Sequence, residues 1–312
     1  MTEKSTLLNC HKRIAPYIHK TTVLTSKSID KMIGAELFFK CENFQRMGAF
    51  KMRGATNAIL QLSEAQKRKG VVTHSSGNFA QAISLAAKSL GISAHIVMPL
   101  NSPKVKQNAV KEYNGQITLC EPTLEAREKA AQQIINEIDA TFIHPSNDID
   151  VIHGNATAAM ELLEEQPNLD YIFAPIGGGG LLAGTALAGY FFGNKCHIIG
   201  AEPVEADDAY RSLLSGTIQL NKSANTIADG LRTTLGAINF PIIKKHVKVI
   251  TRVSEEEISK AMLLIWERMK IIVEPSSAVA LAAVLKSQNK IRNQKVGIII
   301  SGGNVDFKNL PF

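Results

Sequence analysis

Cysteine is scarce in this chain, and the four that occur are far apart. Cys10, Cys41, Cys120 and Cys196 show neither the Cys-x-x-Cys spacing of redox motifs nor the spacing of zinc fingers. We therefore predict free, buried thiols and a reducing compartment, without a disulfide framework.

Long hydrophobic runs are also missing. A membrane-spanning helix needs about 20 apolar residues. No apolar stretch in this chain approaches that length. The first five residues, Met1–Ser5, lack the apolar region of a signal peptide. These absences predict a soluble, cytoplasmic protein that has no membrane partner.

Concentrated charge of one sign is the third absence. The formal net charge is +7, but Lys and Arg are scattered, with only short clusters such as Lys67–Lys69. No aromatic residues are interleaved with them and no nucleic-acid-binding motif accompanies them, so we predict a solvated basic surface and no nucleic-acid partner. An anionic small-molecule ligand fits the charge equally well.

What the chain does contain is a long alternation of strand and helix patterns. In residues 70–148, strands at 70–74, 93–98 and 116–120 alternate with helices at 78–90, 103–113 and 123–138. The alternation resumes after Pro145, although residues 203–253 are less regular. This pattern predicts an α/β protein with parallel sheets, in which a small domain (70–148) is inserted into a large one (1–69 plus 149–312).

One segment stands out at a strand-to-helix connection. Lys51 follows the strand pattern 36–40 and precedes a helical pattern that begins near Met52 and continues to about Lys69. Phe50 and Met52 would partly desolvate the amine, which lowers its pKa and favours a Schiff base. Taken alone, Lys51 is better interpreted as an ordinary solvated lysine. The other motifs of the chain favour the Schiff-base interpretation instead.

Four consecutive glycines separate a buried strand from a helix. A bare backbone at a helix start can close around a phosphate group, whereas the alternative is a floppy loop. Because the loop is wedged between two apolar elements, we favour anion binding. The spacing fits neither a Walker A loop nor the dinucleotide fingerprint. The residues are Gly177, Gly178, Gly179 and Gly180.

Two further turns carry polar residues. Ser75-Ser76-Gly77-Asn78 follows a strand, and its hydroxyl groups and exposed N–H groups suit a carboxylate, while Asn78 equally suits helix capping. Ser301-Gly302-Gly303-Asn304 follows the last strand. It is either a simple turn or part of a ligand site, because ligands bind at the carboxyl edge of parallel sheets.

Together these motifs resemble a known family. The Lys51 segment, the two serine turns, the four glycines and Glu274-Pro275-Ser276-Ser277-Ala278 occur in the order and spacing of the fold type II pyridoxal-phosphate enzymes. They look most like the serine/threonine dehydratase and serine racemase branch, which includes threo-3-hydroxyaspartate ammonia-lyases. The resemblance implies two open, twisted, mostly parallel sheets flanked by helices, pyridoxal 5'-phosphate as cofactor and a homodimer.

The resemblance also implies roles for individual residues. Lys51 would hold the cofactor as a Schiff base and, once freed, would remove the Cα proton of an amino-acid substrate. Ser76 would be the acid/base on the opposite face of the cofactor, so that reprotonation there inverts Cα. The remaining cofactor contacts would come from Phe50 against the ring, Asn78 at the 3-hydroxyl, Gly177–Gly180 around the phosphate and Ser301 at the ring nitrogen. The substrate carboxylate would be bound by Ser75, Ser76 and Asn78, with Arg127 as a further candidate.

An acidic loop resembles the divalent cation site of the same branch. Glu202, the backbone carbonyl of Ala206 and Asp208 would supply hard oxygen ligands to Mg²⁺ or Ca²⁺, whereas the alternative is an acidic surface loop. Two positions depart from the common pattern: Phe79 stands where many members carry histidine, and Ala49 replaces a frequent serine. The chain ends soon after Asp306, so we expect no regulatory domain and no feedback control by isoleucine.

We therefore predict an ammonia-lyase, or dehydratase, that converts L-threonine or L-serine to a 2-oxo acid and ammonia. The alternatives are serine racemase and threo-3-hydroxyaspartate ammonia-lyase. A β-replacement enzyme such as cysteine synthase is less consistent with the Lys51 segment, which lacks the usual Ser-x-Lys-Asp pattern. A non-catalytic protein that binds the cofactor or an amino acid is a more distant alternative, for which Phe79 is the hint.

Overall fold

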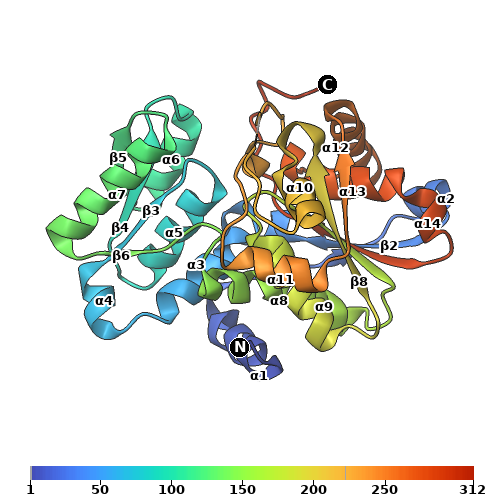
Figure 1. The fold of residues 1–312 in the computed structure, drawn as a ribbon, viewed down its shortest axis with the longest axis horizontal. Coiled ribbons are helices and arrows are strands. Elements are labelled where there is room, and N and C mark those ends of the chain that lie inside the picture. The colour runs from blue at the N-terminus through green and yellow to red at the C-terminus, as the bar shows by residue number, and fades with distance from the viewer. Residues whose placement is uncertain (1, 222) are drawn as a thin grey trace.

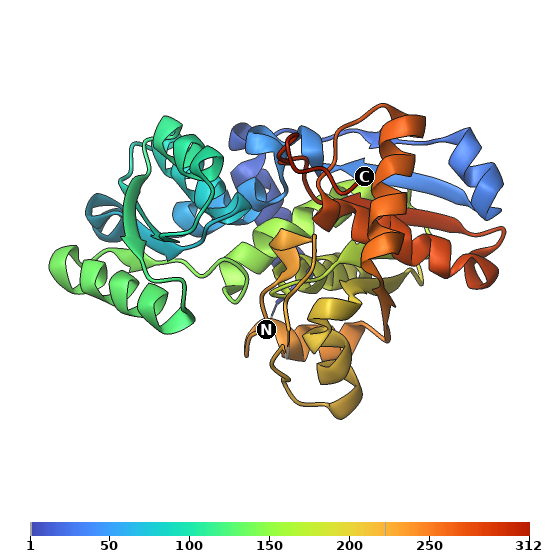
Figure 2. The same ribbon diagram turned by 90° about the horizontal axis from the view of Figure 1, so that it is seen from above.

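The structure is a computed structural model that describes residues 2–221 and 223–312. It contains two sheets, which form two lobes in both Figure 1 and Figure 2. The predicted fold class, two mostly parallel sheets flanked by helices, is confirmed. Within the described residues, no helix combines the length and the apolar character needed to cross a membrane.

The larger sheet has six strands in the order β1-β2-β10-β7-β8-β9. Only the β1–β2 pairing is antiparallel among the described strands of this sheet. The strands are β1 (Val23–Leu24), β2 (Glu36–Cys41), β7 (Tyr171–Pro175), β8 (His197–Pro203), β9 (Val249–Val253) and β10 (Lys295–Ile300).

Helices cover both faces of this sheet because its central strands are apolar on both sides. In β7, Phe173 packs into one core, whereas Ile172 and Ala174 pack into the other. The first core is closed by α2 (Lys27–Ile33), α12 (Glu255–Met269) and α13 (Pro275–Lys286). The second is closed by α1 (Lys4–Ile14), α8 (Ile149–Glu165), α9 (Gly180–Phe192) and α11 (Asn239–His246). The chain also forms α4 (Glu64–Lys69), α10 (Asp208–Ser215) and α14 (Gln288–Ile291).

The smaller sheet has four parallel strands in the order β5-β4-β3-β6. Its core on one face is shared with α3 (Lys51–Leu60) and α5 (Asn78–Ser89), and on the other face with α7 (Leu124–Ile138). The strands are β3 (Val71–His74), β4 (Ala94–Pro99), β5 (Gln116–Cys120) and β6 (Thr141–Phe142), and α6 spans Lys104–Glu112. The division into domains at residues 70 and 148 stays a prediction.

Helix α3, which begins at Lys51, is fixed by a buried ionic cluster. Arg53 is fully buried, and its guanidinium contacts Glu42 at 2.7 Å and Glu161 at 2.8 Å. Lys40 also contacts Glu161, at 2.7 Å. Two cations therefore face two carboxylates in the interior, where removal of one partner would leave a charge uncompensated at a cost of about 3–5 kcal/mol.

The structure corrects several local predictions. The helix predicted from Met52 to Lys69 is two helices, because Ser63 caps α4 in a reciprocal pair of hydrogen bonds with Gln66. Residues 203–253 are more regular than predicted, since they contain α10, α11 and β9. The short elements α2 and β6 were not predicted.

Candidate active site

Three of the predicted motifs meet at the carboxyl edge of the larger sheet. They follow β2, β10 and β7, which are adjacent and parallel. The backbone N–H of Phe50 donates to the carbonyl of Ser301 at 2.9 Å, and Ala49 forms a bridge with Gly302. The fold thus brings the Lys51 segment and the last serine turn into direct contact.

Lys51 lies in an apolar environment at the start of α3. Its Nζ is 5.1 Å from the ring centroid of Phe50 and 5.4 Å from that of Phe79. Burial lowers the pKa of this amine to about 8. Nζ donates a hydrogen bond of 2.7 Å to the carbonyl of Pro145, so the amine is held in place without a carboxylate partner in that contact.

The four glycines, which we call the glycine loop (Gly177–Gly180), are all buried. None of the hydrogen bonds found among residues 2–221 and 223–312 uses a backbone N–H of this loop as donor. Buried donors without acceptors at the start of a 13-residue helix fit an anionic group. The phosphate of pyridoxal phosphate therefore suits this loop.

A Cβ atom at any position of the glycine loop would collide with its surroundings. The nearest atoms would be Leu231 Cα at 2.6 Å from Gly177 and Ser146 Oγ at 2.4 Å from Gly178. At Gly179, whose φ is +82°, the nearest is Leu235 Cδ2 at 2.6 Å, and at Gly180 it is the Ser146 carbonyl at 2.9 Å. The loop is thus tightly packed, which excludes the floppy alternative.

Ser301 is buried and paired with another hydroxyl group. Its Oγ is 3.0 Å from Oγ of Ser277, which also accepts from the Gly302 N–H at 2.7 Å. Ser277 belongs to the Glu274–Ala278 motif, to which we assigned no residue-level role from the sequence. The pair orients the Ser301 hydroxyl at the edge of the sheet.

The serine turn (Ser75–Asn78) comes from the smaller sheet and is only half-buried. Asn78 Nδ2 donates to both carboxylate oxygens of Glu274, at 2.9 and 3.0 Å, and its Oδ1 accepts from Asn304 at 2.9 Å. The capping interpretation of Asn78 is wrong, because Gly77 occupies the cap position and no side chain of the described residues caps α5. Asn78 instead ties the serine turn to two segments of the larger sheet.

Glu274 was not predicted as a site residue. Burial raises the pKa of its carboxyl group to about 7, and the negative charge of Asp229 acts in the same direction. Arg127 lies on α7, where Nε donates to the carbonyl of Thr123, and its charge contributes to lowering the pKa of the buried His74. Arg127 therefore lies near the strand that precedes the serine turn.

His144 and Pro145 are further residues that sequence reasoning missed. His144 Nδ1 accepts from the backbone N–H groups of Ser146 at 3.1 Å and Asn147 at 2.8 Å. Burial lowers the pKa of this imidazole to about 4, which keeps Nδ1 free to accept. This turn presents the Pro145 carbonyl to Lys51, a contact 94 residues apart in sequence.

The predicted cation ligands lie together between β8 and α10. Glu202 accepts from the N–H groups of Ala209 and Tyr210, at 2.9 and 2.8 Å, and Asp208 Oδ2 accepts from Leu235 at 3.0 Å. Burial raises the pKa of Glu202 to about 9 and that of Asp208 to about 6. Among the described residues, Asp208 Oδ1 is buried and has no hydrogen-bond partner, which suits a cation.

This candidate cation site depends on a backbone oxygen. Within the part of the chain that the structure describes, no three Asp, Glu, His or Cys side chains gather into a metal centre. Two carboxylates and the carbonyl of Ala206 would make a hard oxygen site, so the residues present fit Mg²⁺ or Ca²⁺.

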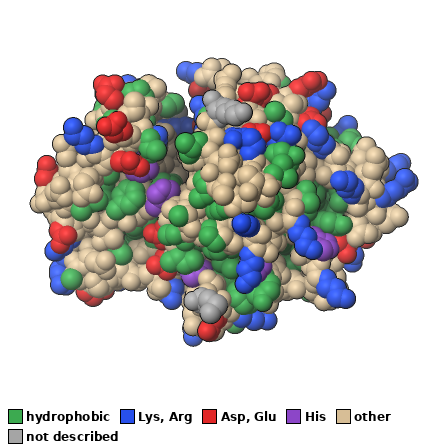
Figure 3. All heavy atoms as spheres, in the orientation of Figure 1, with side chains coloured by type: hydrophobic (Ala, Val, Ile, Leu, Met, Phe, Trp, Pro, Cys, Tyr) green, Lys and Arg blue, Asp and Glu red, His purple; other side chains and the backbone are tan. Residues whose placement is uncertain are grey.

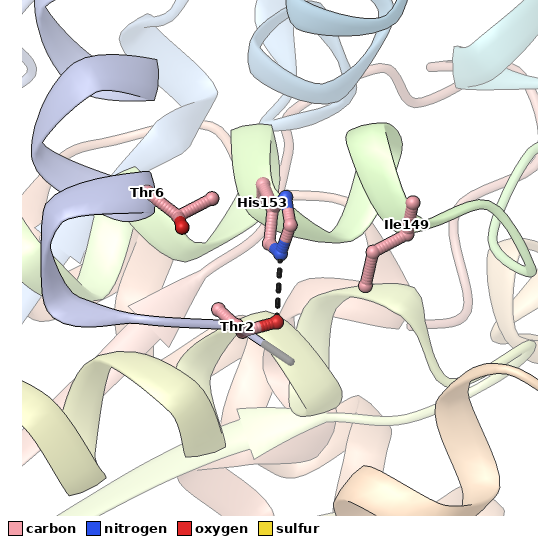
Figure 4. A pocket seen from close by; sticks show the side chains of 4 residues that line it. All are labelled: Thr2, Thr6, Ile149 and His153. Carbon is pink, nitrogen blue, oxygen red and sulfur yellow. Dashed lines mark hydrogen bonds between the residues drawn. The ribbon is translucent and has the colours of Figure 1, made fainter.

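Other surface features lie outside this site. A cavity of ≈ 260 Å³ between α1 and α8 is lined by Thr2, Thr6, Ile149 and His153, none of which is a predicted site residue (Figure 4). His153 Nε2 and Thr2 Oγ1 are 3.0 Å apart there. On the face shown in Figure 3, Lys and Arg are scattered and acidic side chains lie among them.

The fold and the converging turns define an α/β enzyme of fold type II, and comparison with known proteins identifies the family. Residues 14–302 match the model of the pyridoxal-phosphate-dependent enzymes. The chain therefore belongs to this family, and the predicted resemblance is confirmed.

The similar proteins include racemases and lyases. Serine racemase of Dictyostelium discoideum is 52% identical over 304 residues, covering 96% of this chain and 94% of the relative. Beta-hydroxyaspartate dehydratase of Paracoccus denitrificans is 46% identical over 306 residues, covering 98% and 97%. The crystal structure of the Dictyostelium serine racemase superposes with a TM-score of 0.93, covering 97% of this chain and 98% of that one. These relatives support the racemase and hydroxyaspartate alternatives better than the serine/threonine dehydratase that we named first.

Proposed function

We propose that this enzyme racemises serine and also eliminates water from β-hydroxy amino acids such as threo-3-hydroxyaspartate, releasing a 2-oxo acid and ammonia. The proposal is supported by the way the fold joins two segments from different sheets, each of which carries one of the proposed proton-transfer groups. Lys51, with its lowered pKa, comes from the larger sheet, and Ser76 comes from a turn that Asn78 ties to that sheet.

Pyridoxal phosphate, when bound, supplies an aldehyde that links to amines and a ring that withdraws electrons from Cα of an amino acid. The glycine loop would hold its phosphate, and Phe50 would contact its ring. Ser301 would meet the ring nitrogen with a hydroxyl, which does not force that nitrogen to stay protonated and so favours prompt loss of a β-hydroxyl group.

The protein groups then handle the substrate and its protons. Ser75, Ser76 and Asn78 would bind the substrate carboxylate, with Arg127 as an additional cation near this turn. The neutral amine of Lys51 would take the Cα proton, and Ser76 would exchange a proton at the opposite face of the same carbon. Transfer at both faces inverts Cα, whereas departure of the β-hydroxyl after the first transfer leads to elimination.

The test is a substrate panel on purified protein supplied with pyridoxal phosphate. L-Serine, L-threonine and threo-3-hydroxyaspartate are each incubated with and without Mg²⁺, and 2-oxo acid and D-enantiomer are both measured. We expect D-serine from L-serine, and 2-oxo acid from the hydroxy amino acids without any added thiol, which a β-replacement enzyme would require.

Other outcomes would contradict the proposal in distinct ways. Release of 2-oxo acid with no D-enantiomer would mean that the enzyme is a lyase without racemase activity. Bound cofactor with no turnover of any substrate would indicate the non-catalytic binding protein. The proposal further includes a homodimer, which light scattering would test, and a small domain (70–148) that closes on the substrate.

A further inference from the structure

We propose that Asn239 is a positioning residue that turns the N–H groups of the glycine loop toward the phosphate of the cofactor. This inference rests on the proposed role of the glycine loop as the phosphate site. Asn239 was not among the predicted residues, since nothing in its local sequence, Gly236-Ala237-Ile238-Asn239, suggests a ligand site.

Every polar position of the Asn239 amide has a partner. The residue begins α11 and is fully buried. Nδ2 donates to the carbonyl of Gly178 at 2.7 Å and to that of Ser146 at 3.1 Å, while Oδ1 accepts from the N–H of Gly236 at 3.1 Å. Two carbonyls require a donor and one N–H requires an acceptor, so this environment fixes which end of the amide is nitrogen.

The contact with the Gly178 carbonyl determines where the next N–H points. The described residues contain no cis peptide bond, so the C=O of Gly178 and the N–H of Gly179 lie on opposite sides of one planar unit. Because the carbonyl points at Asn239, the N–H points away from it. Gly179 has φ +82°, a left-handed conformation that glycine adopts without strain.

Asn239 and Ser146 together support one side of the loop. A Cβ at Gly179 would lie 2.7 Å from Asn239 Oδ1, and one at Gly180 would lie 2.9 Å from the Ser146 carbonyl. Asn239 also fixes Ser146 through its second hydrogen bond. Loss of the amide would leave two buried carbonyls without a donor, and each can regain a partner only if its peptide rotates. Rotation of the Gly178–Gly179 peptide would turn a phosphate donor away from the ligand.

The experiment compares two ligands that differ only in the phosphate. Purified cofactor-free protein is titrated with pyridoxal 5'-phosphate and, separately, with pyridoxal, following the absorbance of the bound aldehyde. For Asn239→Ala we expect the dissociation constant of pyridoxal phosphate to rise about tenfold or more, and that of pyridoxal to change less than about twofold. A residue that only stabilises the fold would weaken both ligands alike.

Asn147→Ala is the matched control. Asn147 accepts from the N–H of Ile238 at 2.7 Å, so it also fixes the segment before α11, but it makes no hydrogen bond to the glycine loop among the described residues. We expect this variant to bind both ligands as the wild type does, within about threefold. An equal loss of pyridoxal phosphate binding in Asn147→Ala would overturn the specific role of Asn239.

Asn239→Leu is the second variant, which refills the space without any hydrogen bond or charge and is used if Asn239→Ala fails to fold. The same selective loss is expected. Wild-type affinity for pyridoxal phosphate in both Asn239 variants, or an equal loss of both ligands, would refute the inference while leaving the phosphate site intact. If the wild type itself binds pyridoxal as tightly as pyridoxal phosphate, the proposed phosphate site is wrong.

Discussion

The glycine loop and the serine turn occupy equivalent places in the two sheets, yet they are built in opposite ways. Each connects a parallel strand to the start of a helix. In the glycine loop every added Cβ would meet an atom at 2.9 Å or less, whereas a Cβ at Gly77 of the serine turn would meet no atom of the described residues within 4 Å. The first turn is buried at all four positions, and the second is half-buried throughout.

This difference matches the two kinds of ligand that we assign to these turns. A cofactor phosphate stays bound through many reaction cycles and takes no part in bond making, so a rigid, preorganised cup suits it. A substrate carboxylate must enter and leave in each cycle, which requires a turn that can move. Asn78, through Glu274 and Asn304, connects the serine turn to two segments of the larger sheet.

The largest expected effect comes from Lys51, whose Nζ lies 5.4 Å from the ring centroid of Phe79, the residue that follows the serine turn. Lys51→Ala should lower all turnover by about 10⁴-fold or more and abolish the absorbance band at about 410 nm that we expect from the bound cofactor, because both the proposed covalent anchor and the proposed base are lost. A spectrophotometric titration checks this. A retained band would mean that another lysine is the anchor.

The substitution Ser76→Ala tests the serine turn alone. The proposed racemisation should fall by about 10²–10⁴-fold, because one of the two proposed proton-transfer groups is removed, while 2-oxo acid formation should fall by less than about tenfold. Parallel assays of D-serine and 2-oxo acid measure the ratio. Equal losses in both assays would assign Ser76 to binding only.

A pair of matched substitutions tests the packing contrast itself. Gly177→Ala should lower the free energy of unfolding by about 1–3 kcal/mol, because its Cβ would meet backbone, the Cα of Leu231, at 2.6 Å. Gly77→Ala should change it by less than about 0.5 kcal/mol. Urea unfolding of the cofactor-free variants gives both values. Similar losses of unfolding free energy in the two variants would contradict the difference in packing between the two turns.

The pH dependence of cofactor capture follows from the pKa of Lys51, which burial lowers to about 8. Only the neutral amine attacks an aldehyde, and it is the form that lacks the proton, so its fraction rises with pH. The rate of cofactor binding should therefore increase about tenfold per pH unit below this pKa and level off above it. Stopped-flow absorbance measures the rate. A profile that is still rising steeply above pH about 9 would indicate an ordinary, solvated lysine.

The smallest expected effect is that of cation binding on stability, which would reach the glycine loop through Leu235. Asp208 holds the N–H of Leu235, and Leu235 packs against Gly179. Mg²⁺ should raise the melting temperature by about 2–6 °C at saturating concentration, and Asp208→Asn should remove this response. Asp207→Asn is the matched control, because Asp207 is paired with Arg211 and Arg252 instead. An unchanged response in Asp208→Asn would exclude the site.

Much of the fold could be predicted from the sequence, because strands and helices of ordinary length carry clear periodicity. The two-residue strand β6 is too short to show one. Residues 203–253 were predicted as less regular because their order depends on side-chain-to-backbone contacts, such as the hydrogen bonds of Glu202 to α10 and of Asp208 to Leu235. Such side-chain-to-backbone contacts leave no local pattern.

The residues of the candidate site also differ in whether a local sequence pattern indicates them. The positions of Ser301, the serine turn and the glycine loop could be predicted because each follows a strand pattern, where parallel sheets place their ligands, and Lys51 lies between a strand pattern and a helix pattern. Pro145 and Asn239 could not, because they act through one carbonyl or one amide on residues far away in sequence. These two residues reach the site through three-dimensional packing, which no spacing pattern along the chain indicates.

The ionic cluster around Arg53 has a consequence for biosynthesis. The guanidinium is paired with Glu161, which lies 108 residues later in the chain. While the polypeptide emerges from the ribosome, the positive charges of Arg53 and Lys40 lack this counterion until that later segment has been translated. We therefore expect the ionic cluster to be completed, and helix α3 to be fixed against α8, only after synthesis has passed α8, which ends at Glu165.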